Sequence, residues 1–354
     1  MPTNVSPEYK RAKEAFQKAR EPSERLQCLR DMLRTIPKHK GTEHLQADLK
    51  SRIKELTEEL AGPRKGAAST GPAHTVRPDG AAQVVLVGPP NAGKSSIHVA
   101  LTGSHAEVGP YPHSTQAPLP GMLPYQDIHI QLVDLPPVDA EFMEPWMPNA
   151  LQQANAALLV VDLNIPGCVE NVAAIREKLD EKRISLVETW PGPLDPSYLV
   201  TPPPLRESAV ADDPDGNEDD PFRVFLPTLL VASKSDLAPD PEEIELLEEL
   251  VGAKYPAILC STETGEGLDR IGRLVFEGLE IIRVYTKAPG KPPEKDKPYT
   301  LFRGDSVEDV ARLVHRDIAA SLKFGRIWGS GKFDGQQVGR DHVVSDGDVV
   351  ELHS

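Results

Sequence analysis

The chain has 354 residues, with 39 Lys and Arg against 54 Asp and Glu, so its formal net charge is −15. That length leaves room for two or three domains with sizeable cores, and the acidic balance argues against a general affinity for nucleic acid. The three cysteines are isolated, and the sequence has neither an apolar leader segment nor an apolar run of membrane length. These features predict a cytoplasmic protein.

The charge is unevenly distributed along the chain. Residues 1–65 contain 15 basic and 10 acidic residues, and residues 284–354 contain 11 of each, so the middle of the chain is strongly acidic. Any contact with RNA or a ribosome is therefore expected to be local, and the N-terminal segment is the favoured place for it.

Residues 1–61 are predicted to form a helical hairpin. Ser6 can cap a helix whose first position is Pro7, residues 25–33 are helical in pattern, and Thr42 can cap the last helix. A solvated packing element and an RNA-contacting element are equally good interpretations of its basic outer faces. The last helix is predicted from apolar residues at helical spacing, namely Leu45, Leu49, Ile53, Leu56 and Leu60.

Residues 62–80 are rich in Gly, Pro, Ala and Ser and are predicted to be a linker. Residues 81–283 alternate apolar strand patterns with helical ones, which predicts a mostly parallel sheet with helices on both faces. The proline-rich and acidic insertion 189–222 is expected to be a flexible loop, with an acidic docking segment as the less favoured alternative. The predicted strands are 83–87, 128–133, 156–162, 225–232 and 257–260.

Residues 284–354 are predicted to form a separate small α+β module. A helix is expected at 306–320, capped by Ser306 with Asp309 three residues later. The strands expected around this helix are 299–303, 326–328 and 348–352.

The segment from Gly88 to Ser95 fits the phosphate-binding pattern G-x-x-x-x-G-K-[ST], and it lies between a predicted strand and a predicted helix. In that setting the backbone N–H groups and the helix N-terminus can cradle phosphates. Lys94 would reach the β- and γ-phosphate oxygens, and the Ser95 hydroxyl would bind Mg2+. The residues predicted to line the nucleotide here are Gly88, Asn91, Ala92, Gly93, Lys94, Ser95 and Ser96.

Four further segments follow in the order expected of a GTPase. Thr115 offers a second hydroxyl for Mg2+, and Asp134, at a strand end, can support the metal, so that Lys94, Thr115 and Asp134 form the predicted catalytic group. Ser233-Lys234-Ser235-Asp236 follows an apolar strand, and the Asp236 carboxylate can accept two hydrogen bonds from guanine. Backbone N–H groups near Ser261 and Thr262 are expected to meet the guanine carbonyl.

Together with the segments Lys38–Leu45, Arg283–Lys287, Trp328–Ser330 and Val338–His342, these motifs make the chain resemble the Obg-like GTPases. Within that class it resembles the developmentally regulated GTP-binding (DRG) branch, with a C-terminal TGS domain of the ubiquitin-like β-grasp fold. The resemblance implies slow, Mg2+-dependent hydrolysis of GTP to GDP and phosphate. It also implies a switch associated with translation, ribosomes or RNA, and for some members a dedicated protein partner.

Three positions depart from the usual GTPase motifs. Pro137 replaces the glycine of the Asp-x-x-Gly motif and has no N–H for the γ-phosphate. Ser233 replaces the asparagine of Asn-Lys-x-Asp, and Val138 lies where Ras-type proteins have a water-orienting glutamine. The alternative to a switch is therefore a nucleotide-binding interaction scaffold with impaired hydrolysis. Asn91 has two interpretations of equal weight, a ligand for a stimulatory K+ ion or a stabiliser of the loop turn.

Overall fold

The structure is a computed structural model that describes residues 7–19, 22–36, 43–61, 76–104, 117–139, 142–202, 222–237, 242–331 and 333–354. These residues fall into two compact units. One contains the N-terminal helices together with Phe222 and Arg223, and the other contains the rest of the described chain. Within the described ranges, no helix combines the length and the apolar character that a membrane span requires.

The described residues of the N-terminal unit form three helices, α1 (Pro7–Lys18), α2 (Pro22–Thr35) and α3 (Glu43–Ala61). The helical character of the three predicted segments is confirmed, but the prediction that they form a two-helix hairpin is wrong. Pro22 explains the extra break, because proline is accepted in the first turn of a helix but cannot continue the one before it. The apolar stripe of the last helix is confirmed from Leu45 to Leu56, while Leu60 is exposed. The predicted caps Ser6 and Thr42 lie outside the described residues.

Phe222, from the far end of the predicted flexible insertion, completes the core of this helical unit. Its side chain is 2% exposed and packs edge-on against Phe16, with ring centroids 6.4 Å apart. The guanidinium of Arg52 lies 4.4 Å from the centroid of the Phe222 ring. The unit therefore depends on a residue more than 150 positions away in the sequence.

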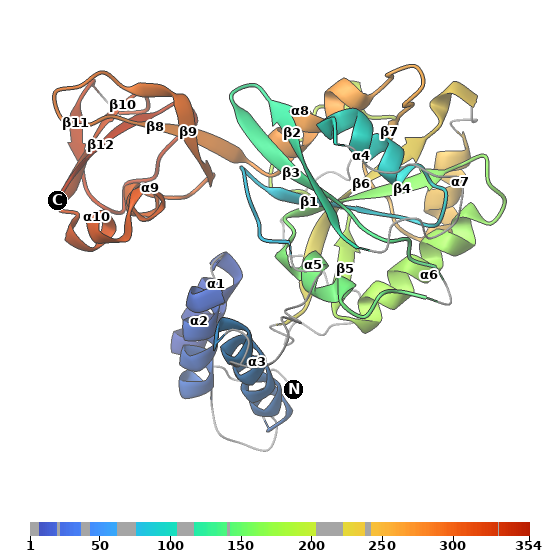
Figure 1. Ribbon diagram of the computed structural model, residues 1–354, viewed down its shortest axis with the longest axis horizontal. Helices are drawn as coiled ribbons and strands as arrows, with labels where there is room; N and C mark the ends of the chain where they lie inside the picture. The colour runs from blue at the N-terminus through green and yellow to red at the C-terminus, as the bar shows by residue number, and fades with distance from the viewer. Residues whose placement is uncertain are drawn as a thin grey trace, which may run out of the picture. The chain divides into compact units, whose positions relative to one another are not determined.

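The larger unit contains a seven-stranded, mostly parallel sheet in the order β2-β3-β1-β4-β6-β5, with β7 also paired to β6 (Figure 1). Among the described strands of this sheet, β2 alone runs antiparallel to its neighbour. The five predicted strands of this sheet are confirmed, and the sequence patterns missed β2 and β5. The strands are β1 (Gln83–Val87), β2 (Leu119–Tyr125), β3 (Ile128–Asp134), β4 (Ala156–Asp162), β5 (Ile184–Val187), β6 (Val224–Ser233) and β7 (Ala257–Leu259).

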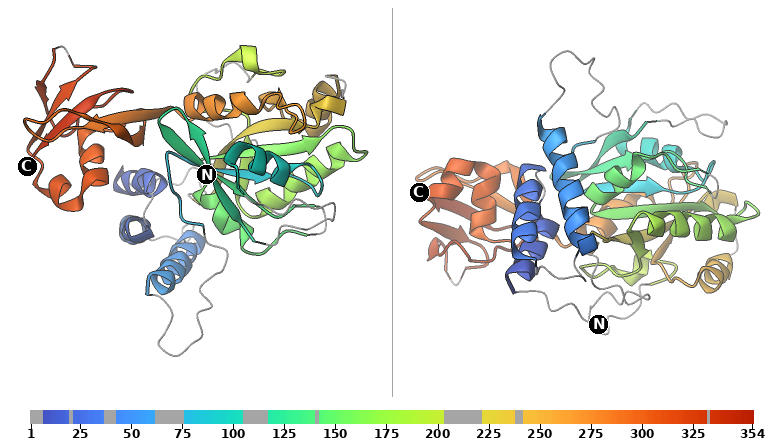
Figure 2. Two further views of the ribbon diagram at one scale, coloured as in Figure 1. Left: turned by 45° about the horizontal axis from the view of Figure 1, so that its top comes forward. Right: turned by 90° about the horizontal axis from the view of Figure 1, so that it is seen from below.

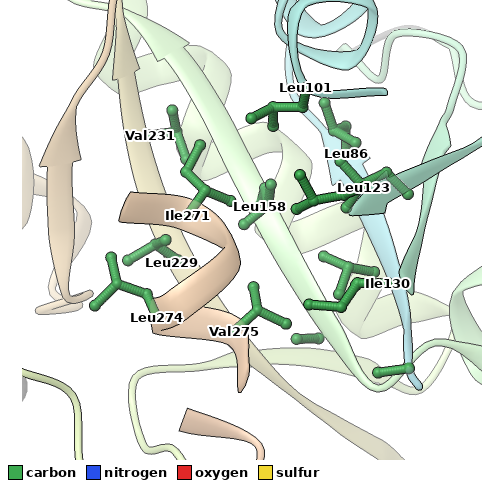
Figure 3. Close-up of a cluster of buried hydrophobic side chains, with 14 of the residues drawn as sticks. Leu86, Leu101, Leu123, Ile130, Leu158, Leu229, Val231, Ile271, Leu274 and Val275 are labelled. Carbon is green, nitrogen blue, oxygen red and sulfur yellow. The ribbon is translucent and has the colours of Figure 1, made fainter. Parts of the chain in front are cut away.

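Helices cover both faces of this sheet, as predicted (Figures 1 and 2). On one face, α4 (Lys94–Thr102) and α8 (Leu268–Gly278) bury the apolar cluster of Figure 3, which includes Leu101 of α4, Ile271 of α8 and the strand residue Leu158. The other face is covered by α5 (Met147–Gln153), α6 (Cys168–Glu181) and α7 (Glu242–Val251). Because β1, β3, β4, β6 and β7 are parallel, their carboxyl ends lie at the same edge of the sheet. In α/β sheets of this kind, ligands bind at that edge.

Part of the predicted flexible insertion is ordered, which corrects that prediction for residues 189–202. Trp190 and Leu194 are buried in the cluster beneath α8, and the Gly192 N–H donates to the Gly278 carbonyl over 2.8 Å. A side chain at Gly192 would collide with the Glu277 carbonyl, because its Cβ would lie 2.2 Å from that oxygen. The acidic stretch 203–221 lies outside the described residues.

The end of the predicted linker also belongs to the larger unit. Gly80 bridges Ile130 of β3, and the Ala81 N–H donates to the His129 carbonyl over 2.8 Å. Residues 76–80 are therefore fixed to the sheet, and residues 62–75 are not described.

The C-terminal module is a five-stranded sheet in the order β11-β10-β12-β8-β9, with the parallel pair β8 and β12 inside it, which is consistent with a β-grasp. It begins with β8 at Ile281, three residues before the predicted boundary. The predicted single helix is two helices, because His315 has an extended backbone, and the Ser306 N–H donates to Asp309 Oδ2 over 2.9 Å as expected. The elements are β8 (Ile281–Thr286), β9 (Glu294–Phe302), α9 (Val307–Val314), α10 (Arg316–Ser321), β10 (Phe324–Trp328), β11 (Gln336–Val338) and β12 (Val349–His353).

Candidate nucleotide-binding site

The phosphate-binding loop connects β1 to α4, as its sequence predicts. Its turn requires left-handed backbone at Asn91, with φ of 60°, and at Gly93, with φ of 90°. Gly88 is needed for close packing, because a Cβ there would lie 2.3 Å from the Val160 carbonyl oxygen. A compact turn of this kind at the start of a helix is suited to binding an anion.

Lys94 lies inside this loop with its side chain buried. Its Nζ donates to the carbonyl of Gly88 over 3.0 Å and to that of Pro89 over 2.9 Å. Burial lowers the pKa of Lys94 to about 8, and the nearby charge of Asp134 opposes that shift. Within the described part of the chain, the acceptors of this desolvated ammonium are neutral carbonyls, so it is well suited to pair with a phosphate.

Ser95 and Asp134 come together at the carboxyl end of β3. The Ser95 hydroxyl donates to Asp134 Oδ2 over 2.6 Å, and the Asp134 side chain is fully buried. A hydroxyl and a carboxylate at this spacing fit Mg2+, which prefers oxygen ligands and retains several waters. Thr115, the other predicted Mg2+ ligand, lies outside the described residues.

Ser233 joins the end of β6 to the phosphate-binding loop. Its buried hydroxyl donates to the Ala92 carbonyl over 2.7 Å and also lies 3.0 Å from the carbonyl of Val161. The serine therefore keeps a direct connection between the two loops, although it lacks the amide of the usual asparagine. The next residue, Lys234, reaches the same loop with its Nζ 3.3 Å from the Asn91 carbonyl.

Asp162 was not predicted as a site residue, and it ion-pairs with Lys234. Its Oδ2 lies 2.6 Å from Lys234 Nζ, and its side chain is 3% exposed. Asp162 is the last residue of β4. A carboxylate at the end of a predicted parallel strand was therefore the feature of the sequence that could have indicated a site residue here. The pairing itself depends on β4 and β6 being neighbours in the sheet.

Asp236 and Ser261 meet at the part of the site predicted to hold guanine. The buried Ser261 hydroxyl donates to Asp236 Oδ1 over 2.6 Å, which fixes the direction of the exposed carboxylate. The Ser261 hydroxyl also accepts the N–H groups of Glu263 and Thr264, each over 3.2 Å. Thr262 is exposed on this loop, whereas Ser96 lies on α4 beside Ser95.

The segment after Asp134 is held against the phosphate-binding loop. Pro137 has no N–H to donate, and the N–H of Val138 donates to the Gly88 carbonyl over 3.2 Å. The Val138 side chain is fully buried, so it offers no polar group to a water. The Asp139 N–H donates to the Phe142 carbonyl over 3.2 Å, so both of the next amides have partners within the chain.

Comparison with known proteins matches the chain to families at the level of its domains. The model of the family described as "50S ribosome-binding GTPase" matches residues 83–189, and the TGS domain model matches residues 282–354. A developmentally-regulated GTP-binding protein 1 homolog from Dictyostelium discoideum is 29% identical, over 93% of this chain and 98% of its own. An uncharacterized GTP-binding protein from Methanocaldococcus jannaschii is 28% identical, over 93% of this chain and 92% of its own.

Among solved structures, a GTP binding protein from Pyrococcus horikoshii OT3 has a TM-score of 0.47 at 18% identity. That alignment covers 77% of this chain and 99% of the other. The sequence relatives and the two domain models together confirm the resemblance: the chain is homologous to the developmentally regulated GTP-binding proteins, and it contains a GTPase domain and a C-terminal TGS domain.

Proposed function

We propose that this protein is a slow, Mg2+-dependent GTPase that acts as a switch in association with ribosomes or RNA. The observation that carries the proposal is the joining of three loops at one sheet edge. Ser233 and Lys234 contact the carbonyls of Ala92 and Asn91, and Ser261 orients Asp236. The loops that would hold phosphate and guanine are thereby fixed relative to each other.

In this proposal each side chain has one role. The buried Lys94 ammonium neutralises phosphate charge, and Asp236 accepts two hydrogen bonds that guanine can donate and adenine cannot. Ser95, Asp134 and Thr115 would hold Mg2+, which supplies charge stabilisation on the transferred phosphoryl group. Because Val138 is buried and apolar, the protein lacks a water-orienting side chain at that position, and slow turnover is expected.

Competition binding tests the nucleotide assignment. Displacement of a fluorescent N-methylanthraniloyl (mant) GDP by GTP and GDP, but not by ATP, is the expected result. Equal displacement by ATP would contradict the role of Asp236. Lys94→Ala is the control, because it should weaken all binding that depends on the phosphate-binding loop.

The ribosome or RNA part of the proposal is supported by the basic N-terminal segment and by the description of the matching family model. Contacts between basic side chains and phosphates weaken steeply as salt rises. Co-sedimentation with ribosomes at increasing salt, in the presence of a non-hydrolysable GTP analogue, should show that dependence.

Charge reversal is a sharper variant than deletion of the N-terminal helices, because deletion would uncover Phe222. Lys10, Lys50 and Lys54 are exposed on α1 and α3, and their joint change to Glu should abolish salt-sensitive sedimentation while mant-GDP binding persists. The matched control reverses Lys323 and Arg326, which are exposed on the TGS domain. Loss of sedimentation only in the control would move the contact to that domain.

The alternative, a nucleotide-binding scaffold with impaired hydrolysis, is favoured by one observation. Pro137 cannot donate to a γ-phosphate, and the amides of Val138 and Asp139 already donate to carbonyls of the chain. Binding of GTP without any release of phosphate would select the scaffold.

A further inference from the structure

The ion pair between Asp162 and Lys234 lies next to Ser233, the residue that replaces the usual asparagine of the Asn-Lys-x-Asp motif. The side chain of Ser233 is shorter than the usual asparagine, so it holds the phosphate-binding loop through a single hydroxyl. Lys234 supplies the neighbouring contact to that loop, and its backbone has a left-handed φ of 56°, a conformation that costs energy in a residue other than glycine. An additional interaction of the Lys234 side chain is needed to offset the cost of this backbone conformation.

The Asp162 carboxylate is itself rigidly held. Its Oδ1 accepts both the N–H and the side-chain Nδ2 of Asn164, each over 3.0 Å. Burial alone would raise the pKa of the Asp162 carboxyl, but the hydrogen bonds from Lys234 and Asn164 outweigh it, and the net shift is downward. The carboxylate is therefore ionised at neutral pH and points its second oxygen at Lys234 Nζ, 2.6 Å away.

We infer that Asp162 is a positioning residue for guanine-nucleotide binding, which holds Lys234 across the junction of β4, β6 and the phosphate-binding loop. The inference rests on the proposed function, because it takes the nucleotide site as given. Lys234 is 41% exposed on its side chain and Asp162 only 3%, so the pair is partly shielded from water and competing ions. Without the carboxylate, the lysine would keep, among its contacts to described residues, the longer one of 3.3 Å to the Asn91 carbonyl.

This role predicts a particular kinetic signature. In the described residues the partners of Asp162 are Lys234 and Asn164, whereas the predicted metal ligands Ser95 and Asp134 contact each other. Loss of Asp162 should therefore weaken GTP and GDP binding alike, by roughly three- to tenfold each. The rate of the single-turnover step at saturating GTP should stay unchanged, because uniform binding alters affinity but not the chemical step.

The test is a double-mutant cycle on mant-GDP affinity with Asp162→Asn, Lys234→Met and the double variant, in the full chain. Asp162→Asn should raise the Kd in the wild-type background and leave it unchanged in the Lys234→Met background. Additive effects, or a wild-type Kd in Asp162→Asn, would overturn the inference. Glu277→Gln is the matched control, since Glu277 forms a 2.7 Å ion pair with Arg273 on α8 and should leave the Kd unchanged.

Two further results separate the possible failures. If Asp162→Asn is unstable, the exposed Asn164→Ala variant removes one donor to the same carboxylate and should still weaken binding, about twofold; an unchanged Kd there would contradict the inference. A wild-type protein that binds no mant-GDP would refute the proposed function, and this inference with it. If the wild type and the Asp162→Asn variant bind mant-GDP with the same Kd, the inference is refuted and the proposed function stands.

Discussion

The buried ammonium of Lys94 should make nucleotide binding depend on pH in a predictable direction. In the free protein, burial lowers the pKa of Lys94 from 10.5 to about 8. A bound phosphate would favour the charged form and move the pKa back upward. Above pH 8, binding must therefore take up a proton, and nucleotide affinity should fall as pH rises.

The size of this effect follows from the size of the shift. The fall in the pKa of Lys94 from 10.5 to about 8 corresponds to about 3 kcal/mol, which is the cost of keeping the buried lysine charged at neutral pH. With a pKa of about 8, most Lys94 side chains are charged at pH 7 and about one in ten at pH 9. Affinity should consequently drop by about tenfold between these two pH values.

Unfolding of the nucleotide-free protein should respond in the opposite sense. The unfolded chain holds this proton up to its ordinary pKa of 10.5, whereas the folded protein releases it above about 8. Between these values the unfolded state binds more protons, so the contribution of Lys94 to stability rises with pH. Opposite slopes for binding and for stability distinguish titration of Lys94 from a general loss of structure at alkaline pH.

The assay is mant-GDP affinity from pH 7 to pH 9 in EDTA, so that metal binding does not contribute to the slope. Lys94→Met is the control, and its residual slope reports the titration of guanine and of other groups. The difference between the two curves should show the tenfold fall. Parallel curves for the wild type and Lys94→Met would refute the argument from burial.

Three other changes test separate parts of the site. Asp236→Asn exchanges an acceptor for a donor, so GTP should bind far more weakly and xanthosine triphosphate should become the better ligand in a competition assay; retained GTP preference would remove Asp236 from the base site. Pro137→Gly restores an N–H where the γ-phosphate is expected, and should raise the preference for GTP over GDP by about tenfold in equilibrium titrations. Unchanged preference would mean that a neighbouring amide, such as that of Val138, leaves its carbonyl partner to serve the phosphate. If Asn91 binds K+ rather than only shaping its turn, single-turnover hydrolysis should be faster in KCl than in NaCl, and equal rates would exclude that role.

The sequence predicted those parts of the molecule whose signals are local. The phosphate-binding loop could be found because its glycines and Lys94 satisfy steric and charge demands within eight residues. The central strands could be found because both of their faces are buried, which gives continuous apolar runs. β2 was missed because Pro120, Gly121 and Pro124 look like a loop, and such residues are tolerated in it because it lies at the edge of the sheet.

What the sequence did not reveal depends on contacts between distant segments. Phe222 ends a stretch whose composition suggests disorder, yet it is buried by helices near the N-terminus. The partners of Ser233 and the ion pair of Asp162 follow from the order of β1, β4 and β6 in the sheet, which no local pattern encodes. The break at His315 likewise had no proline or glycine to announce it.

Single-turnover hydrolysis of γ-labelled GTP by the full-length protein tests the central claim most directly. A GTPase switch should release phosphate slowly but measurably with Mg2+, at a rate well above that of Lys94→Ala under the same conditions. GTP that stays bound and intact, with release no faster than in the Lys94→Ala control, would contradict the switch and leave the scaffold.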